Sequence, residues 1–437
     1  MDTAKALITA EQSRFSTLRP AQTDGPFALD AAFRADTDPR KVNLIIGAYR
    51  DDREEPWHLP SVTEAKRRLK VEHSHHEYLP LQGSPKFVEA SRRVLFGPAI
   101  VQQQQPFLAS IQTVSGTGAN SLVAVFLEQE HLRPTNIWLP NPTWINHADI
   151  WKVNAPNVKM QWYPYYDDAK RELDFGAMVE TLQRDCQEHD AILLHACAHN
   201  PTGRDPSQRQ WRELAQLCLK KRLFVIFDSA YQGFASGDLD SDAWAIRHFV
   251  SYPSIELAVC QSFSKNLGLY GERVGALHMM VSRSNPNGAN LAAAVQDNLI
   301  DLQRACVSMA PLFGSRIASE VLGNSDLEEM WKADLSTMSG RIKAMRSALH
   351  DELLQLRTPG SWDHITEQTG MFSYTGLSKE QVEELQLKHH IYLLPTGRAS
   401  MCGVTSANVS YIARAIHEVV SGQPAGISPE ANSIKCL

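Results

Sequence analysis

The sequence lacks two features that would point to a membrane or to nucleic acid. It has no stretch approaching the ~20 uninterrupted apolar residues that a membrane-spanning helix requires. It has no Lys/Arg block longer than Lys66-Arg67-Arg68, and its formal net charge is -6. Because binding to a phosphate backbone needs a clustered basic face, we expect neither a membrane nor a nucleic acid as partner.

Paired cysteines are also lacking. The seven cysteines are odd in number and scattered, and none forms a CxxC pair. This pattern argues against a disulfide framework or a zinc site and indicates reduced thiols inside the cell, so we expect no metal. The first 19 residues contain acidic side chains and no apolar segment, unlike a secretory signal. Their basic residues leave a mitochondrial interpretation open, but transit peptides contain fewer acidic residues and more arginine. We expect a cytoplasmic protein.

The middle of the chain alternates strand and helix signals. Apolar runs at 191–196 and 223–227 flank residues 207–219, whose apolar side chains follow helical spacing. This order predicts a βαβ unit with buried, parallel strands. Further strands are predicted at 255–260, 274–280 and 370–374, and a long helix at about 326–356. The residues after Ser421 are rich in Gly, Pro, Ser and Asn and predict a frayed tail.

A lysine among small hydroxyl side chains is the first chemical signal. It occurs in Ser262-Phe263-Ser264-Lys265-Asn266, eight residues before Arg273. Such a lysine can form an imine with an aldehyde cofactor while hydroxyls and an arginine hold a phosphate. Pyridoxal 5'-phosphate carries both groups. On its own a Ser-x-Ser-Lys stretch is more often a polar loop, so the interpretation depends on the sequence upstream.

Two polar side chains follow the strand predicted at 223–227. Asp228 closes this strand and Tyr231 comes three residues later. Ligands of α/β sheets bind at the carboxyl ends of strands, where a carboxylate can keep a pyridine nitrogen protonated. The Tyr231 hydroxyl could reach the phenolic oxygen of the same ring. A helix N-cap for Asp228 and simple core packing for Tyr231 are the alternatives.

Three further segments fit the same cofactor. Small residues at 115–118 precede a helical run and expose backbone N–H groups, which favour a phosphate; an ordinary N-cap is the alternative. Asn200 lies in a turn after the strand at 191–196, where a plain Asn-Pro turn would look the same. Trp144 follows a short strand signal and could stack on a ring, although most tryptophans only pack in a core.

Two arginines are candidates for binding substrate carboxylates. Arg398 lies in a turn of small residues between apolar segments, and Arg316 follows a similar stretch. Each could hold a carboxylate with a bidentate fork. Taken singly, each could equally be a solvated or salt-bridged surface arginine.

In chain order these pieces resemble the class I aminotransferases, and within them the aspartate aminotransferase family, from about Phe33 to about Val420. The resemblance implies an α/β PLP-dependent transferase fold, with a large domain built on a mixed, mostly parallel sheet and a smaller α/β domain. We expect an N-terminal arm and first part of the small domain at 1–56, the large domain at 57–344, and the small C-terminal domain with its flexible tail at 345–437. The matching segments are Asp38 to Leu44, Gly47 to Arg50, His76 to Pro80, Ser115 to Gly118, His195 to Gly203, Phe227 to Phe234, Gln261 to Arg273 and Gly397 to Gly403.

The resemblance also implies an activity and a role for each residue. The reaction would be reversible transfer of the amino group from L-aspartate to 2-oxoglutarate by a ping-pong cycle, in a homodimer with shared active sites. Lys265 would form the imine and shuttle a proton, Asp228 would pair with the pyridinium nitrogen, and His147 would support Asp228. Tyr231 and Asn200 would bind the phenolic oxygen, and Trp144 would stack on the ring. The phosphate ligands would be Ser115, Gly116, Thr117, Ser262, Arg273 and, across the dimer interface, Tyr78. The substrate-binding residues would be Gly47, Trp144, Asn200 and Arg398, with Arg316 of the neighbouring subunit at the distal carboxylate.

The chain departs from the family pattern at three places. Ile45 and Ile46 replace a Gly-Val pair, Met309-Ala310-Pro311 replaces Asn-Pro-Pro, and residues 282–303 look like an insertion. These departures leave open a related PLP-dependent aminotransferase or lyase acting on a different amino acid in a specialised pathway. A catalytically dead binding protein is the third possibility, against which intact Lys265, Asp228 and Tyr231 argue.

Overall fold

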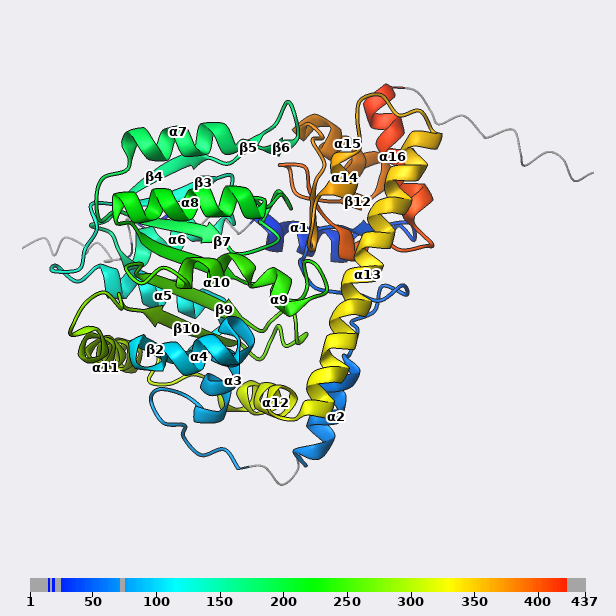
Figure 1. Cartoon of the computed structure of the whole chain (residues 1–437). Coiled ribbons are helices and arrows are strands. Elements are labelled where there is room, and N and C mark those ends of the chain that lie inside the picture. The colour runs from blue at the N-terminus through cyan, green and yellow to red at the C-terminus, as the bar shows by residue number, and fades with distance from the viewer. Residues whose placement is uncertain (1–14, 16–17, 20–24, 71–74, 423–437) are drawn as a thin grey trace, which may run out of the picture.

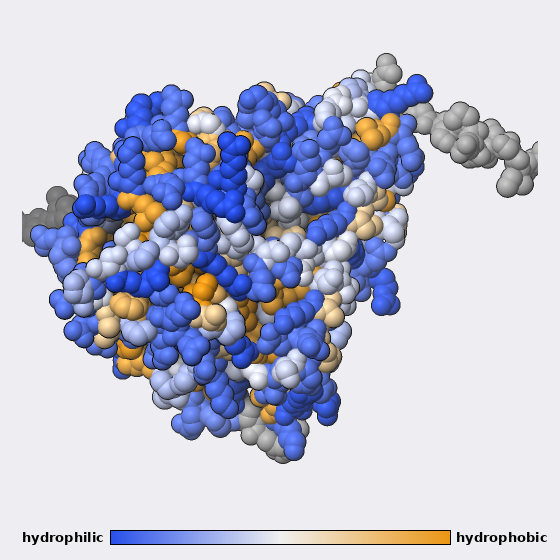
Figure 2. Space-filling model, in the orientation of Figure 1, coloured by the Kyte–Doolittle hydropathy of each residue, from blue (hydrophilic) through white to orange (hydrophobic). Residues whose placement is uncertain are grey.

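The computed structural model describes residues 15, 18–19, 25–70 and 75–422 (Figure 1). The N-terminal residues considered for targeting, except 15, 18 and 19, lie outside this range. So does the predicted C-terminal tail beyond residue 422. No helix in the described ranges is both long and apolar enough to cross a membrane. The face shown in Figure 2 is mostly hydrophilic, with smaller hydrophobic areas between the polar side chains.

The centre of the molecule is a seven-stranded sheet in the order β2-β10-β9-β8-β7-β3-β4. β10 is antiparallel to both of its neighbours, and the other pairings are parallel. The expected mixed, mostly parallel sheet is therefore confirmed. The strands are β2 (Leu108–Val114), β3 (Asn136–Asn141), β4 (Lys159–Pro164), β7 (Ala191–His195), β8 (Phe224–Ser229), β9 (Leu257–Ser262) and β10 (Val274–Met280).

The predicted βαβ unit is β7, α8 (Gln208–Lys221) and β8. A capping box between Ser207 and Gln210 starts the helix, because each side chain bonds a backbone N–H that the first turn leaves free. β7 is buried along its whole length, as expected for a parallel strand covered on both faces.

Helices cover both faces of the sheet (Figure 1). Side chains of β7 alternate between two apolar clusters, with Ile192 and Leu194 on one face and Ala191 and Leu193 on the other. The first cluster includes α7 (Phe175–Asp185), α8 and α10 (Trp244–Val250). The second includes α5 (Ser115–Leu127), α6 (Asn146–Asn154) and α11 (Gly288–Cys306). α11 covers most of the stretch interpreted as an insertion, and its Leu299 is fully buried in the second cluster.

A smaller unit combines the two ends of the described chain. β1 (Val42–Asn43) pairs in parallel with β12 (Ile391–Tyr392), and β11 (Phe372–Tyr374) pairs antiparallel with β13 (Arg398–Ser400). α1 (Gly25–Ala35), α14 (His364–Glu367), α15 (Lys379–His389) and α16 (Val409–Ser421) surround these strands.

One long helix connects the two units. α13 (Ser325–Gln355) packs on α2 (Pro60–Arg68) and α12 (Leu312–Gly323) and also on α14 and α16. The domain limit expected between 344 and 345 falls inside this continuous helix. The limits at 56/57 and 344/345 stay predictions.

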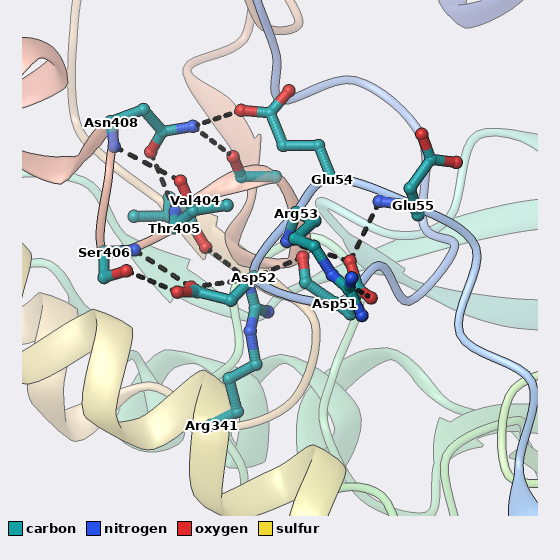
Figure 3. Close-up of polar contacts among 11 residues, drawn as sticks. Asp51, Asp52, Arg53, Glu54, Glu55, Arg341, Val404, Thr405, Ser406 and Asn408 are labelled. Carbon is teal, nitrogen blue, oxygen red and sulfur yellow. Dashed lines mark hydrogen bonds and ion pairs between the residues drawn. The ribbon is translucent and has the colours of Figure 1, made fainter.

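The loop that follows β1 is fixed to the smaller unit by polar contacts (Figure 3). The Asp52 carboxylate accepts hydrogen bonds from the backbone N–H and the hydroxyl of Ser406. Arg341 of α13 donates to the carbonyl oxygens of Val404 at 2.9 Å and Asp51 at 3.3 Å. These contacts hold the backbone a few residues beyond Ile45, Ile46 and Gly47, which line the cavity described next.

Candidate active site

A cavity of about 810 Å³ lies at the carboxyl ends of the central strands, between the sheet and the smaller unit. This is the end of an α/β sheet where ligands bind. The cavity brings together residues that are far apart in the sequence. Twelve of the predicted site residues line it: Gly47, Ser115, Gly116, Thr117, Trp144, Asn200, Asp228, Tyr231, Ser262, Lys265, Arg273 and Arg398.

Asp228 is a buried carboxylate next to the end of β8. Burial by itself would raise its pKa, but a hydrogen bond from His147 and the proximity of His195 and Lys265 lower the pKa below its usual value. The His147 Nε2 atom lies 3.0 Å from an Asp228 oxygen. Asp228 is therefore ionised and can hold a protonated heterocyclic nitrogen, and His147 contacts this carboxylate from the side of α6.

The support of Asp228 extends through two residues that the sequence did not single out. The Thr143 hydroxyl lies 2.9 Å from His147 Nδ1 and 2.9 Å from His195 Nε2. Burial, followed by the nearby His147, lowers the pKa of His195 to about 3, so its ring is neutral. Their positions in the sequence could have identified them as site residues, because Thr143 follows β3 and His195 ends β7.

Lys265 follows β9 and carries an amine whose environment favours the neutral form. Its Nζ lies 5.4 Å from the centroid of the Tyr231 ring. Burial lowers the pKa of Lys265, Arg273 lowers it further, and Asp228 opposes both effects. A lowered pKa increases the unprotonated fraction that can attack a carbonyl carbon. Burial raises the pKa of Tyr231, whose hydroxyl also interacts with Asn200.

The start of α5 forms a cradle for an anion. Ser115 has a φ of 63°, and its N–H donates to the carbonyl oxygen of Arg273 at 3.0 Å. Its hydroxyl lies 3.1 Å from that of Ser264. A Cβ atom on Gly116 would lie 3.0 Å from the Ser262 Cβ, so a glycine allows this close approach. The hydroxyls, the free N–H groups of a helix start and a guanidinium together suit a phosphate.

Arg398 is a buried cation on β13 at the other side of the cavity. It donates to the carbonyl oxygen of Ile45 at 2.7 Å. Ile45 stands where the family pattern has a glycine, and it takes part in this contact through its backbone. The guanidinium carbon lies 4.2 Å from the centroid of the Phe372 ring. A Cβ atom on Gly47 would lie 2.6 Å from Phe372 Cζ, which explains the glycine there. A buried guanidinium of this kind suits a carboxylate.

Tyr78 and Arg316 do not line this cavity in their own chain. They share a separate depression of about 800 Å³. The Tyr78 side chain is 87% exposed, and Arg316 donates to the carbonyl oxygen of His75 at 3.2 Å. Both were expected to act on a neighbouring subunit, and both assignments stay predictions.

Arg304 is another exposed arginine, on a segment whose neighbouring residues contact the loop of Tyr78. It lies at the end of α11, where the Gln303 amide donates to the carbonyl oxygen of Leu81 at 3.3 Å and Met309 sulfur accepts from Leu79 N–H at 3.1 Å. These bonds place Arg304 beside the loop that carries Tyr78. Nothing in the sequence around Arg304 singled it out, because it lies among the helical residues that precede the 309–311 turn.

The assembled groups match the chemistry of pyridoxal phosphate. The lysine amine suits its aldehyde, Asp228 its ring nitrogen, Tyr231 and Asn200 its phenolic oxygen, and the Ser115 cradle its phosphate. Arg398 remains for a substrate carboxylate. Within the described residues, no three His, Cys, Asp or Glu side chains are arranged to hold a metal ion.

Comparison with known proteins gives concordant matches over nearly the whole chain. The family model for aminotransferase class I and II matches residues 39–416. An L-tyrosine:2-oxoglutarate aminotransferase of Aspergillus ustus is 49% identical over 414 residues, covering 93% of this chain and 78% of that protein. The cytoplasmic aspartate aminotransferase of Schizosaccharomyces pombe is 44% identical over 413 residues, covering 94% and 99%. The solved structure of aspartate aminotransferase from Saccharomyces cerevisiae cytoplasm superposes with a TM-score of 0.89 at 39% identity, covering 94% and 99%.

Proposed function

The chain belongs to the aminotransferase class I and II family and is a pyridoxal-phosphate-dependent aminotransferase, and we propose that it transfers the amino group of L-aspartate reversibly to 2-oxoglutarate. The observation that supports the proposal is the cavity itself, which is lined by Lys265, Asp228 and the buried Arg398. The S. pombe relative, matched over 99% of its length, supports aspartate as donor. Its name also supports a cytoplasmic location.

The cofactor supplies an aldehyde that takes up an amino group and a pyridinium ring that withdraws electrons. In our proposal, Asp228 holds the proton on the ring nitrogen, and the hydrogen bonds through His147 keep this carboxylate ionised and oriented. Lys265 Nζ would be the base that removes the proton from the substrate Cα and the acid that gives it back. Tyr231 and Asn200 hold the phenolic oxygen, and Trp144 covers the ring and excludes water.

The α-carboxylate of the substrate and the phosphate of the cofactor would be held by different sides of the cavity. Arg398, the backbone at Gly47 and the Asn200 amide bind the α-carboxylate, which every amino-acid substrate carries. The phosphate is held by Ser115, Gly116, Thr117, Ser262 and Arg273.

A second substrate carboxylate requires one more cation. The described lining of the cavity contains three Lys or Arg side chains, Lys265, Arg273 and Arg398, and each already has a role. We therefore propose that the distal arginine comes from a second subunit of a homodimer, together with Tyr78 at the phosphate. Arg316 is the arginine expected from the sequence, and Arg304 is the competing candidate because it flanks the loop of Tyr78.

Transfer from an aromatic amino acid such as L-tyrosine is the second candidate function. Apolar and aromatic side chains form much of the cavity wall, including Phe27, Ile46, Trp162 and Tyr374. The A. ustus tyrosine aminotransferase is 49% identical to this chain. An apolar wall of this kind would receive an uncharged ring without a distal arginine.

Kinetics with donors of different charge test the proposal. Loss of a buried charge-assisted pair costs about 2–5 kcal/mol, so removing the true distal arginine, by Arg316→Ala or Arg304→Ala, lowers kcat/KM for aspartate by orders of magnitude. The same variant spares alanine and tyrosine. Arg398→Ala impairs every donor, because all carry the α-carboxylate.

The exposed Arg212, which stacks on Trp244, provides the matched control, and Arg212→Ala keeps wild-type kinetics. Equal losses for aspartate and alanine in Arg316→Ala would show that Arg316 is structural. A wild type that turns over tyrosine but not aspartate would establish the second candidate function instead.

A further inference from the structure

Arg346 is a buried cation on α13 with no carboxylate partner. Its side chain is 2% exposed, and it forms no ion pair with any described residue. Burial lowers its pKa to about 9, which leaves the guanidinium charged at neutral pH. Because a buried charge without a counter-ion is costly, its hydrogen bonds must compensate for the lost hydration.

The hydrogen bonds of Arg346 all go to one loop. Its guanidinium donates to the carbonyl oxygens of Ile365 at 3.0 Å, Gly370 at 3.0 Å and Phe372 at 2.5 Å. These residues lead from α14 into β11. A planar guanidinium presents its donors in a fixed fork, so three bonds from one side chain hold the loop in a single arrangement.

The last residue of this loop reaches the candidate active site. The Phe372 ring lies 4.2 Å from the guanidinium carbon of Arg398, measured to the ring centroid. It meets the Tyr231 ring edge-on, with 6.4 Å between centroids. It also fills the space that a side chain at Gly47 would need. Phe372 therefore separates the α-carboxylate side of the cavity from the core of the smaller unit.

The backbone at Phe372 is linked to Arg398 a second time. β11 and β13 pair so that Phe372 lies opposite Ser400 and Tyr374 opposite Arg398. A shift of the Phe372 carbonyl would move both the ring beneath Arg398 and the strand that pairs with it. A cation stacked on an aromatic face keeps its edge available for a bidentate carboxylate contact.

We propose that Arg346 is a positioning residue for substrate binding: it holds the Phe372 carbonyl, and thereby keeps the Phe372 ring under Arg398 in the orientation that receives the α-carboxylate. This inference rests on the proposed function, because that function assigns the α-carboxylate to Arg398. Arg346 touches neither substrate nor cofactor in this proposal, so its effect should appear in substrate binding rather than in the cofactor.

The test measures carboxylate binding and turnover in the holoenzyme. Arg346→Lys keeps the charge but not the fork, Arg346→Met removes both, and Phe372→Leu removes the ring. We expect each variant to raise KM for the amino donor and for 2-oxoglutarate about tenfold, or about 1.4 kcal/mol, with a smaller change in kcat and an unchanged cofactor absorbance. The calorimetric Kd for succinate, a dicarboxylate without an amino group, should rise by the same factor.

Arg247 supplies the matched control. It is a half-buried arginine that donates to the carbonyl oxygens of Leu95 and Val94, and these residues do not line the cavity. Arg247→Lys should lower the melting temperature and leave KM and the succinate Kd unchanged. A purely structural role for Arg346 would give this same result in Arg346→Lys and would overturn the inference.

A double variant provides the second criterion. If Arg346 acts through the ring, the double variant Arg346→Lys with Phe372→Leu has the same KM and succinate Kd as Phe372→Leu alone. If the two residues act independently, their losses of binding free energy add. Additive losses would overturn the inference even if Arg346→Met fails to fold. A wild type that binds succinate but turns over no amino acid would refute the proposed function and leave the inference about Arg346 open to test. The succinate Kd of the variants would still measure the effect of Arg346 on carboxylate binding. A wild type without succinate binding would overturn both.

Discussion

Two neighbouring side chains at the strand ends, Lys265 and Asp228, are both buried but differ in the protonation state that their surroundings favour. Burial favours the neutral amine of Lys265, whose pKa it lowers. Asp228 is as deeply buried, yet its hydrogen bond with His147 keeps its pKa below the usual value. One side chain is thus kept reactive and the other kept charged, and the difference comes from the neighbours of Asp228, His147 first among them, rather than from burial.

His195 extends this argument to a pH dependence. Its pKa, about 3, lies below the ordinary value of about 6.5 mainly because its ring is buried. The folded state therefore binds fewer protons than the unfolded state between these values, so this residue favours folding above pH 6.5 and loses that contribution as the pH falls. Near pH 5.5 the loss is on the order of 1 kcal/mol, which corresponds to a melting temperature lower by roughly 1–2 °C.

We expect His195→Gln, which keeps a group able to bond Thr143, to show a smaller drop in melting temperature between pH 7.5 and 5.5 than the wild type. Differential scanning calorimetry measures this difference. His189 is an exposed histidine, and its replacement by Gln is the matched control. An identical drop in wild type and His195→Gln would contradict a buried, neutral His195.

At the scale of elements, the phosphate cradle depends on how closely β10 approaches the start of α5. A Cβ atom on Gly275 would lie 2.4 Å from the carbonyl carbon of Ser115. Backbone cannot yield as a flexible side chain can, so Gly275→Ala should displace the Ser115 turn and cost about 1–3 kcal/mol of stability. We expect the Kd for pyridoxal phosphate, measured by equilibrium dialysis, to rise at least tenfold.

Gly271 is the natural control for this variant. It lies four residues before Gly275, and a Cβ atom there meets nothing within 4 Å. Gly271→Ala should bind the cofactor as the wild type does. A Gly275→Ala protein with unchanged cofactor affinity would mean that the contact with Ser115 does not shape the cradle.

The sequence predicted those features that are local. Asp228 and Asn200 could be placed at strand ends because apolar runs and turn residues define where strands stop, and the limits of β10 were predicted as observed. Contacts between distant segments carry no such local signal. The bonds of Arg346 to residues 365–372 and the approach of Gly275 to Ser115 emerge only when the elements are packed. In the sequence alone, nothing distinguishes Arg346 from the other charged residues of the long predicted helix.

At the scale of the whole molecule, the residues proposed for the site fall into two groups. Lys265, Asp228 and Arg398 line the cavity, whereas Tyr78, Arg304 and Arg316 lie outside it on the same chain. A closed two-fold dimer places the same surface of each subunit against the other. Residues outside one cavity can therefore complete the cavity of the partner, which is the arrangement that the proposed dicarboxylate specificity requires.

Hybrid dimers test this arrangement directly. Lys265→Ala subunits are mixed and refolded with subunits that lack the distal arginine, Arg316→Ala or Arg304→Ala, whichever fails with aspartate. Each homodimer alone has no intact site for aspartate. In a hybrid, one site combines the intact Lys265 of one subunit with the intact arginine of the other. With random pairing, half of the dimers are hybrids and one of their two sites works, so we expect about a quarter of wild-type aspartate turnover. A mixture that stays as inactive as its components, although size-exclusion chromatography shows dimers, would mean that each subunit builds its site alone.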